Sequence, residues 1–409
     1  MNHRQRMRGG TCRPDRRAVL GGLLAAGAAV AGAGPSHAAP AAATPAMPAM
    51  PAGLPALRRG LNLTHWFEYE QGQDVPAAEL AALRAAGFDH VRIPVDPVVG
   101  GWVPDGGVTA GVRPAFMSAL RAALEAAIGA GLEVVFDLHT TPESKARIEQ
   151  QAPLERSLVA LWSQFGRALA DLPTARLAFE LYNEPQYYGA HASRWPPLQQ
   201  RLLAALRERA PRHLVLLSGN EGGSLKGLRA TPPLAGPADT AVAWTFHYYE
   251  PFLFTHQGAH WLDTRYTTAG LRGDIRYPAA LQAGITPKMS RPHPRAAQEL
   301  ADYRAAGWGA ARVRADIDAA GAWARQLGLR LVCNEFGAIR AHVDAASRYR
   351  WMADVRSALE ANALGWTLWD YTDIFGITSA SAQLQRSGTR AIEPAALHAL
   401  GLQTSSAAR

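Results

Sequence analysis

Apolar residues along this chain recur with two different periods. Eight short runs are apolar on both faces, as strands of a covered parallel sheet are: 60–66, 90–95, 132–139, 177–183, 213–219, 241–249, 329–335 and 365–370. Between them, apolar positions repeat every three or four residues, which predicts helices over 77–86, 115–130, 154–170, 198–209, 297–327 (broken within this range) and 345–361. Eight strands alternating with helices predict a single (β/α)8 TIM barrel of the α/β class.

One connection of this predicted barrel is much longer than the others. Residues 250–296 separate the sixth strand from the helix that follows it, and they are rich in aromatic side chains, among them Phe252, Trp261, Tyr266 and Tyr277. Long loops in compact domains are usually functional or disordered, and this one has too many aromatic residues for plain disorder. We therefore expect it to form part of a binding cleft.

The N-terminal residues predict export. Residues 1–17 contain six arginines and one aspartate, and the uncharged run that follows ends on a small-x-small cleavage pattern, Ser36-His37-Ala38. The pair Arg16-Arg17 just before the apolar run is typical of a twin-arginine signal. We interpret residues 1–38 as a signal peptide, 39–57 as an extended Ala/Pro-rich linker and 58–409 as the barrel domain, located in the periplasm or secreted.

Charge and cysteine content narrow the range of partners. The whole chain has a net charge of +8, but the signal carries most of the excess, so the remainder has about +3. That balance does not indicate a nucleic-acid partner. We expect a monomer that has no membrane contact once the signal is removed. Cys333 is the one cysteine outside the signal and lies in an apolar run, which is typical of a buried small residue.

Polar side chains gather at the predicted C-terminal ends of the strands, where TIM barrels collect their active-site residues. Seven of the eight strands end on groups that can ionise, hydrogen-bond or stack. The residues singled out as a candidate site are Arg92, His139, Asn183, Glu184, His247, Tyr249, Glu335 and Trp369. Around one rim, they predict a functional pocket.

Two of these strand ends carry a glutamate directly after an asparagine, at Asn183-Glu184 and at Glu335. Retaining glycoside hydrolysis needs two carboxyl groups about 5–5.5 Å apart, one to attack the anomeric carbon and one to act as acid and then as base. Arg92 beside one carboxylate would keep it ionised. Asn183 can bond a sugar 2-hydroxyl, and Trp369 offers a flat apolar face to a sugar ring.

Taken in order, these residues resemble glycoside hydrolase family 5, the cellulase family of the clan whose catalytic glutamates end the fourth and seventh strands. The segments VRIPV, DLH, LYNEP, CNEFG and GWTLWDY resemble its arginine, histidine, acid/base, nucleophile and closing strands. The resemblance covers roughly residues 58–375. It implies a retaining double displacement with Glu184 as acid/base and Glu335 as nucleophile.

The resemblance also assigns the supporting residues. It implies that Arg92 and Tyr249 support Glu335, and that His139 and His247 lie in the first sugar subsite. It implies no metal and no cofactor. Consistent with this, His256 and His260 are four residues apart but do not lie on a predicted helix, so they do not indicate a metal site.

Several residues keep a second interpretation. Arg92 could pair structurally with Asp89 or Asp96, and His139 could be a core histidine bonded to the backbone. Trp366 competes with Trp369 as the sugar platform, because alternate residues of a strand point to opposite sides. Five aromatic residues fit either stacking or packing: Trp66, Trp102, Tyr187, Tyr188 and Trp261.

The sequence therefore predicts an exported retaining glycoside hydrolase with a polysaccharide or oligosaccharide substrate, first of all an endo-β-1,4-glucanase. A β-mannanase or an exo-β-1,3-glucanase would use the same chemistry, because the difference lies in loop shape. A non-catalytic glycan-binding barrel is the alternative of another class, and it is disfavoured because a binder has no use for the acid/base carboxyl.

Overall fold

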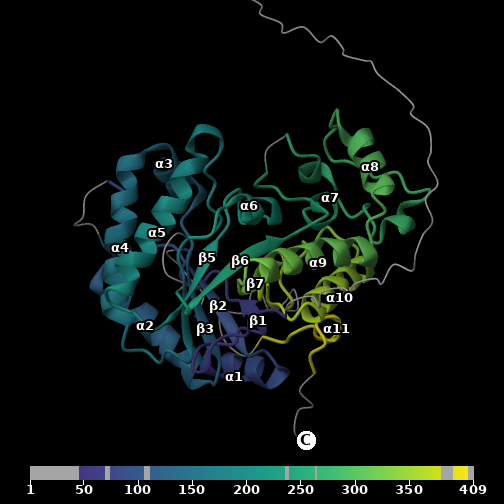
Figure 1. Ribbon diagram of the computed structural model, residues 1–409. Coiled ribbons are helices and arrows are strands. Elements are labelled where there is room, and N and C mark those ends of the chain that lie inside the picture. Colours follow the sequence, from purple (N-terminus) through teal and green to yellow (C-terminus); the bar gives the residue numbers. More distant parts are fainter. Residues whose placement is uncertain are drawn as a thin grey trace, which may run out of the picture. The chain divides into compact units, whose positions relative to one another are not determined.

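The computed structural model describes residues 46–69, 74–105, 111–234, 239–262, 265–378 and 390–403. Eight parallel strands form a closed barrel in which β8 pairs with β1 (Figure 1). The strands are β1 (Arg59–Asn62), β2 (His90–Val95), β3 (Glu133–Leu138), β4 (Leu177–Glu180), β5 (Leu214–Ser218), β6 (Val242–Tyr248), β7 (Leu331–Phe336) and β8 (Gly365–Leu368). The predicted (β/α)8 barrel is confirmed; the predicted signal peptide and the linker up to residue 45 lie outside the described residues.

Helices follow the strands around the barrel. They are α1 (Ala77–Ala86), α2 (Pro114–Gly129), α3 (Pro142–Gln150), α4 (Glu155–Leu169), α5 (Trp195–Arg207), α6 (Leu225–Ala230), α7 (Phe252–Thr255), α8 (Ala296–Ala305), α9 (Ala310–Gln326), α10 (Ala345–Ala361) and α11 (Pro394–Ala399). α4 shows why such stretches dock: Leu158, Leu161, Trp162 and Phe165 share one stripe and are fully buried. In the described part of the chain, no helix is long and apolar enough to cross a membrane.

The long connection after β6 and the break in the helix that follows are both confirmed. The connection carries the short helix α7, two 3-10 turns (Thr267–Gly270 and Ala279–Gln282) and α8. The helical pattern over 297–327 divides into α8 and α9 at Gly307, whose φ of 61° is a left-handed conformation that favours glycine.

β4 ends three residues earlier than its apolar run predicts, at Glu180 rather than at Asn183. The chain turns away at Glu184, which adopts a left-handed conformation, with φ of 45°, that a strand does not allow. The Asn183 N–H still donates to the Leu138 carbonyl of β3, at 2.9 Å. Glu184 is therefore held at the rim of the barrel, on a tight turn just beyond the strand.

The side chains that point into the barrel change from apolar to polar along the barrel axis. Toward the N-terminal ends, buried apolar residues form one cluster: Leu57, Val135, Ala178, Leu214, Leu216 and Ala243. Toward the C-terminal ends, the buried inward residues are polar: Asn62, Arg92, Asp137, Glu180 and Asn334. The expectation that the strands are apolar on both faces is wrong for this upper level, because its charges are paired with one another rather than excluded from the interior.

The described part of the predicted linker, residues 46–57, lies against the lower end of the barrel. Met50 and Leu54 pack on the apolar cluster there. The main-chain N–H groups of Ala56 and Leu57 both donate to Glu133 Oε2, at 2.9 Å. This segment therefore covers the apolar cluster at the end of the barrel opposite the candidate site.

Candidate active site

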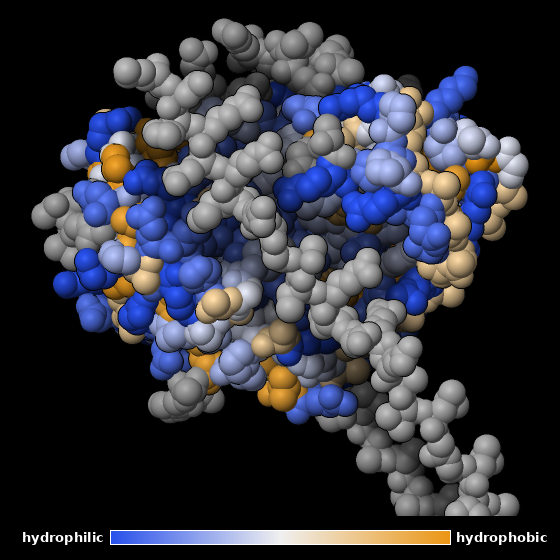
Figure 2. Space-filling view, turned by 90° about the horizontal axis from the view of Figure 1, so that it is seen from above, coloured by the Kyte–Doolittle hydropathy of each residue, from blue (hydrophilic) through white to orange (hydrophobic). Residues whose placement is uncertain are grey.

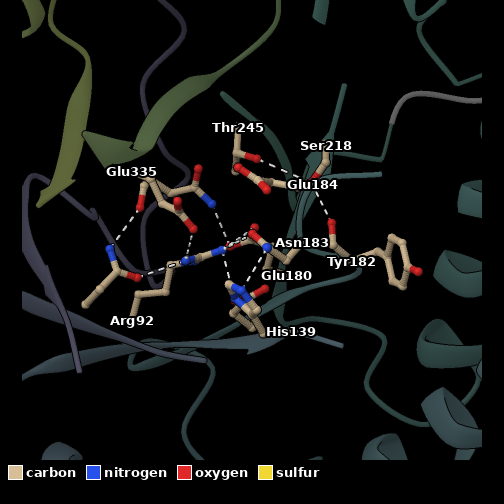
Figure 3. Close-up of polar contacts among 12 residues, drawn as sticks. Arg92, His139, Glu180, Tyr182, Asn183, Glu184, Ser218, Thr245 and Glu335 are labelled. Atoms are coloured by element: carbon tan, nitrogen blue, oxygen red, sulfur yellow. Dashed lines mark hydrogen bonds and ion pairs between the residues drawn. The ribbon is translucent and has the colours of Figure 1, made fainter. Parts of the chain in front are cut away.

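Arg92 of β2 lies at the centre of the buried polar level (Figure 3). Its guanidinium contacts five side chains from β1, β3, β4, the turn after β4 and β7, at 2.7–2.9 Å: Asn62, Asp137, Glu180, Asn183 and Glu335. Burial acts to lower the pKa of Arg92, but the charges of three carboxylates outweigh it and raise that pKa well above its usual value. Arg92 is thus a permanent cation that ties five elements together.

Glu335 of β7 accepts hydrogen bonds on both carboxylate oxygens. Arg92 Nη1 donates to Oε1 at 2.8 Å, and Tyr249 Oη donates to Oε2 at 2.9 Å. Burial, together with the nearby negative charges of Glu335 and Glu184, raises the pKa of Tyr249 well above its usual range, so its hydroxyl keeps its proton and donates. The two donors fix the orientation of a carboxylate that is almost fully buried.

His247 of β6 lies between the two glutamates. Its Nδ1 is 2.8 Å from Glu184 Oε1 and 3.2 Å from Glu335 Oε2. Burial acts to lower the pKa of His247, but Glu335 and Glu184 raise it overall. For Glu184, burial acts to raise the pKa, yet the hydrogen bond and charge of His247 bring it down to about 2. Both shifts favour the charged pair, with the shared proton on His247 Nδ1.

The separation of the two glutamates is short. One carboxylate oxygen of Glu184, one of Glu335 and the ring nitrogen of His247 all lie within 4.8 Å of one another. Of the described residues, these three form the one group of His, Cys, Asp or Glu close enough to hold a metal ion. These three atoms already contact one another through a hydrogen bond and ion pairs, and these contacts are enough to explain why they lie close together.

His139 and Trp369 lie side by side next to this pair. The ring centroids are 5.6 Å apart and the planes 24° apart, so the rings stack. Asn183 Nδ2 donates to His139 Nε2 at 3.0 Å, which places the ring proton on Nδ1, facing Asp137 Oδ2 at 2.8 Å. Burial lowers the pKa of His139, so the ring is neutral. One amide hydrogen of Asn183 remains for a ligand.

The structure decides between several of the open interpretations. Arg92 pairs with neither Asp89 nor Asp96: Asp89 instead bonds His90 and the Arg59 N–H. Trp366 is fully buried, whereas Trp369 is half-buried and stacks on His139. The tryptophan at the site is therefore Trp369, and Arg92 belongs to the site rather than to a surface ion pair.

The five aromatic residues that could either stack on a ligand or pack in the core differ in solvent exposure. Trp66, Trp102 and Tyr187 are buried, and Tyr187 packs on Trp195 with ring centroids 5.9 Å apart. Tyr188 and Trp261 are exposed, at 56% and 48%. Trp261 belongs to the long connection after β6 and contacts Phe375 after β8. Only the exposed pair can offer a face to a ligand.

Four residues of the polar level were not among the predicted site residues: Asn62, Asp137, Glu180 and Asn334. Glu180 binds Arg92 through both oxygens, and Asn334 Nδ2 donates to Glu180 Oε2 at 2.6 Å. The available signal was an acidic residue inside the apolar run 177–181, which a strand tolerates only where a cation meets it. Seen from above, the face of the barrel that bears these strand ends is mostly hydrophilic and is hollowed near its centre (Figure 2).

Comparison with known proteins agrees with this geometry. Residues 55–374 match the family Cellulase (glycosyl hydrolase family 5). Endoglucanase C of Acetivibrio thermocellus is 26% identical over 336 residues, covering 77% of this chain and 91% of that protein. Endoglucanase 3 of Fibrobacter succinogenes is 25% identical over 351 residues, covering 78% of this chain and 50% of that protein.

Solved structures share the fold. An endoglucanase superposes with a TM-score of 0.67 at 23% identity, covering 84% of this chain and 97% of its own. The cellulose synthase subunit Z (CcsZ) of Clostridioides difficile gives a TM-score of 0.65 at 22% identity, covering 84% and 99%. With a family match over most of its length and a closed eight-stranded barrel, this chain belongs to glycoside hydrolase family 5 and is a cellulase-like glycoside hydrolase.

Proposed function

We propose that the protein is an exported, retaining endo-β-1,4-glucanase that uses Glu335 as nucleophile and Glu184 as acid/base. The observation that carries the proposal is the pair of carboxylates at one rim of the barrel, after β4 and on β7, with oxygens within 4.8 Å of each other. That spacing fits the retaining arrangement, since an inverting enzyme leaves about 6.5–9.5 Å between its carboxyl groups to admit a water.

In the first step, a Glu335 oxygen attacks the anomeric carbon while Glu184 protonates the departing glycosidic oxygen. The bond between carbon and Glu335 forms as the bond to the leaving sugar breaks. Arg92 and Tyr249 hold the attacking carboxylate in place through its two oxygens. In the second step, Glu184 takes a proton from water, which attacks the same carbon and releases Glu335.

The acid step requires the shared proton on Glu184, whereas the substrate-free protein holds it on His247. The two groups are joined by a hydrogen bond of 2.8 Å. When a sugar displaces water from the site, the neutral pair of imidazole and carboxylic acid becomes favoured over the charged pair. His247 is therefore the immediate source of the proton that Glu184 passes to the leaving oxygen.

The preference for β-1,4-glucan rests on the relatives and on the platform formed by His139 and Trp369. The two relatives named above are endoglucanases, and one solved neighbour is an endo-β-1,4-glucanase in complex with substrate. A second candidate substrate is β-mannan, because another neighbour, the Cel5A enzyme of Thermotoga maritima, was crystallised with mannotriose.

Release of reducing ends from a panel of soluble polysaccharides tests the proposal: carboxymethylcellulose, β-1,3-glucan and galactomannan. The expected result is release from carboxymethylcellulose with a rapid fall in viscosity, which marks cleavage inside the chain. Preferential cleavage of galactomannan would replace glucan with mannan as the substrate. Binding without release on all three would overturn the hydrolytic proposal, with Glu184→Gln as the inactive control.

Export is proposed from the sequence of residues 1–38 alone. In the native host, conversion of Arg16-Arg17 to Lys-Lys should cause the uncleaved precursor to accumulate inside the cell. Immunoblots of cytoplasmic and exported fractions measure this. Normal processing of that variant would contradict the twin-arginine route. An uncleaved wild-type chain would contradict export by any route.

A further inference from the structure

The turn that carries Glu184 is held in an unfavourable backbone conformation. Glu184 has φ of 45°, a region that residues with a side chain adopt only when their surroundings impose it. The neighbouring peptide groups are all anchored: the Gln186 N–H donates to Glu149 Oε1 at 2.7 Å, and the Pro185 carbonyl accepts from Gly222 N at 2.9 Å. The direction of the Glu184 carboxyl therefore depends on what fixes its own peptide.

Lys145 of α3 provides that fixation. Its Nζ donates to the main-chain carbonyl oxygen of Glu184 at 3.0 Å and lies over the ring of Tyr182, 5.9 Å from the centroid, and the whole residue is buried. An ammonium–carbonyl hydrogen bond is charge-assisted, and such bonds are stronger than those between neutral groups. The lysine thus stabilises the peptide orientation that places the Glu184 side chain toward His247.

The choice of lysine at this position stands out against the rest of the sequence. The chain contains 39 arginines and three lysines, at positions 145, 226 and 288. Lys226 and Lys288 are exposed, while Lys145 is buried. An ammonium is a compact point charge that can meet a single carbonyl in a confined space, whereas a guanidinium is a planar fork suited to two acceptors. A lysine is what this contact requires.

α3 connects this contact to the sugar side of the site. The helix starts at Pro142, three residues after His139, with Thr141 as its N-cap, whose hydroxyl accepts from Ser144 N at 3.2 Å. Two of its three buried polar residues, Lys145 and Glu149, hold the turn after β4. One short helix therefore sets the spacing between His139 and the turn that bears Glu184.

We propose that Lys145 is a positioning residue for Glu184: its ammonium holds the Glu184 carbonyl and thereby fixes the point at which the carboxyl meets the leaving oxygen. This inference rests on the proposed function, because it takes Glu184 as the acid/base. The competing role is purely structural, in which Lys145 only balances the charge of Glu149. The two roles differ in their dependence on the leaving group.

The test compares kcat/KM of the wild type and Lys145→Met on two substrates, at the plateau of each pH profile. 2,4-Dinitrophenyl β-cellobioside has a leaving group that departs without a proton, whereas cellotetraose needs one. General-acid catalysis contributes about 10²–10⁴-fold, so a displaced acid should lower the cellotetraose value by about tenfold or more. The dinitrophenyl value should fall by less than about threefold, because the acid does not assist that step.

Two further variants make the result decisive. Lys226→Met removes an exposed lysine and should leave both values unchanged. Lys145→Arg keeps the buried charge and replaces Lys145→Met in the test if the methionine variant does not fold. Its kcat/KM should also fall on cellotetraose more than on the dinitrophenyl substrate, because a guanidinium cannot reproduce the single contact. An equal loss on both substrates, or no loss, would overturn the positioning role. Wild-type enzyme inactive on both substrates would instead count against the proposed function.

Discussion

The two ends of the barrel interior are built from the same strands and are equally buried, yet they contain opposite chemistry. On β3, Val135 belongs to the apolar cluster at the lower end and Asp137, two residues later, to the charged level at the upper end. On β4, Ala178 and Glu180 are related in the same way. A shift of two residues along one strand changes the interior from hydrocarbon to an ion network.

The difference shows what each end contributes. The lower cluster gains free energy of folding by removing apolar surface from water. The upper level places Arg92 among three carboxylates, an arrangement in which desolvation offsets most of the Coulombic gain. Its buried charges therefore contribute little net stability, and their function is to hold Glu335 and Asn183 in fixed positions. The following variants test this division, in order of decreasing effect.

Arg92→Met should damage both stability and activity. It leaves three carboxylates buried without their cation, and breaking a buried ion pair costs about 3–5 kcal/mol of unfolding free energy. Hydrolysis should become undetectable because Glu335 loses a partner. Arg348→Met is the matched control: Arg348 is also buried but donates to the main-chain carbonyls of Ala338 and Phe375. Urea unfolding of both variants measures the contrast; equal losses would contradict a special role for the network.

Leu216→Ala should affect stability alone. Leu216 is fully buried in the lower cluster and contacts neither catalytic glutamate in the hydrogen-bond network, and truncation of a buried leucine costs about 2–5 kcal/mol. At a temperature where the variant stays folded, kcat/KM should match the wild type. Urea unfolding and initial rates on carboxymethylcellulose give the two values. A tenfold loss of kcat/KM in the folded variant would mean that the two ends are coupled.

His247→Asn should move the basic limb of the kcat/KM profile to lower pH, by about one unit or more. In the wild type, the essential proton is lost at the raised pKa of His247. Without the imidazole, Glu184 must hold the proton itself; the limb should move to lower pH because the ordinary pKa of a glutamate, about 4.3, is below that of a histidine, about 6.5. His256→Asn is the control, because burial lowers the pKa of His256 to about 3 and its ring is uncharged throughout. If the basic limb of the His247→Asn profile does not move, His247 and Glu184 do not share the essential proton.

Asp370→Asn should raise stability slightly at neutral pH. Burial, together with the charge of Asp373, raises the pKa of the Asp370 carboxyl well above its usual value. The folded state therefore holds this proton more tightly than the unfolded chain, so stability falls as pH rises above the unfolded value of about 3.9. An amide can keep the bonds to Asp373 N and Thr64 while removing the titration.

Asp370→Asn should be more stable than the wild type at pH 7, because the amide carries no proton for the unfolded chain to lose. The gain should vanish below pH 4, where both states of the wild type are protonated. Melting temperatures of the two proteins across this pH range measure it. A variant that is less stable than the wild type at pH 7 would show that the carboxylate is paired rather than neutral.

The fold could be predicted from the sequence because its signals are local. The predicted ranges 77–86, 90–95 and 345–361 coincide with α1, β2 and α10, since period and length alone separate strand from helix there. The end of β4 was placed three residues too late, because the conformation of Glu184 is imposed by contacts outside the segment.

The candidate site was predictable only in part. Residues at strand ends, such as Glu184, Glu335 and Trp369, stand out because polar or aromatic groups there interrupt apolar runs. Asn62 and Asn334 give no such signal, because their role depends on Arg92 and Glu180 on other strands. Lys145 was equally hidden: its partner is a main-chain carbonyl, which leaves no trace in the sequence.

The central claim is that Glu335 forms a covalent bond to the sugar, and trapping that intermediate tests it most directly. 2,4-Dinitrophenyl 2-deoxy-2-fluoro-β-cellobioside should inactivate the enzyme with release of one dinitrophenolate, and peptide mapping should find the fluorosugar on Glu335. Glu335→Gln should remain unlabelled, whereas Glu184→Gln should still be labelled, because this leaving group needs no acid. A label on another residue, or hydrolysis of cellotetraose to a product of inverted anomeric configuration, would contradict the account.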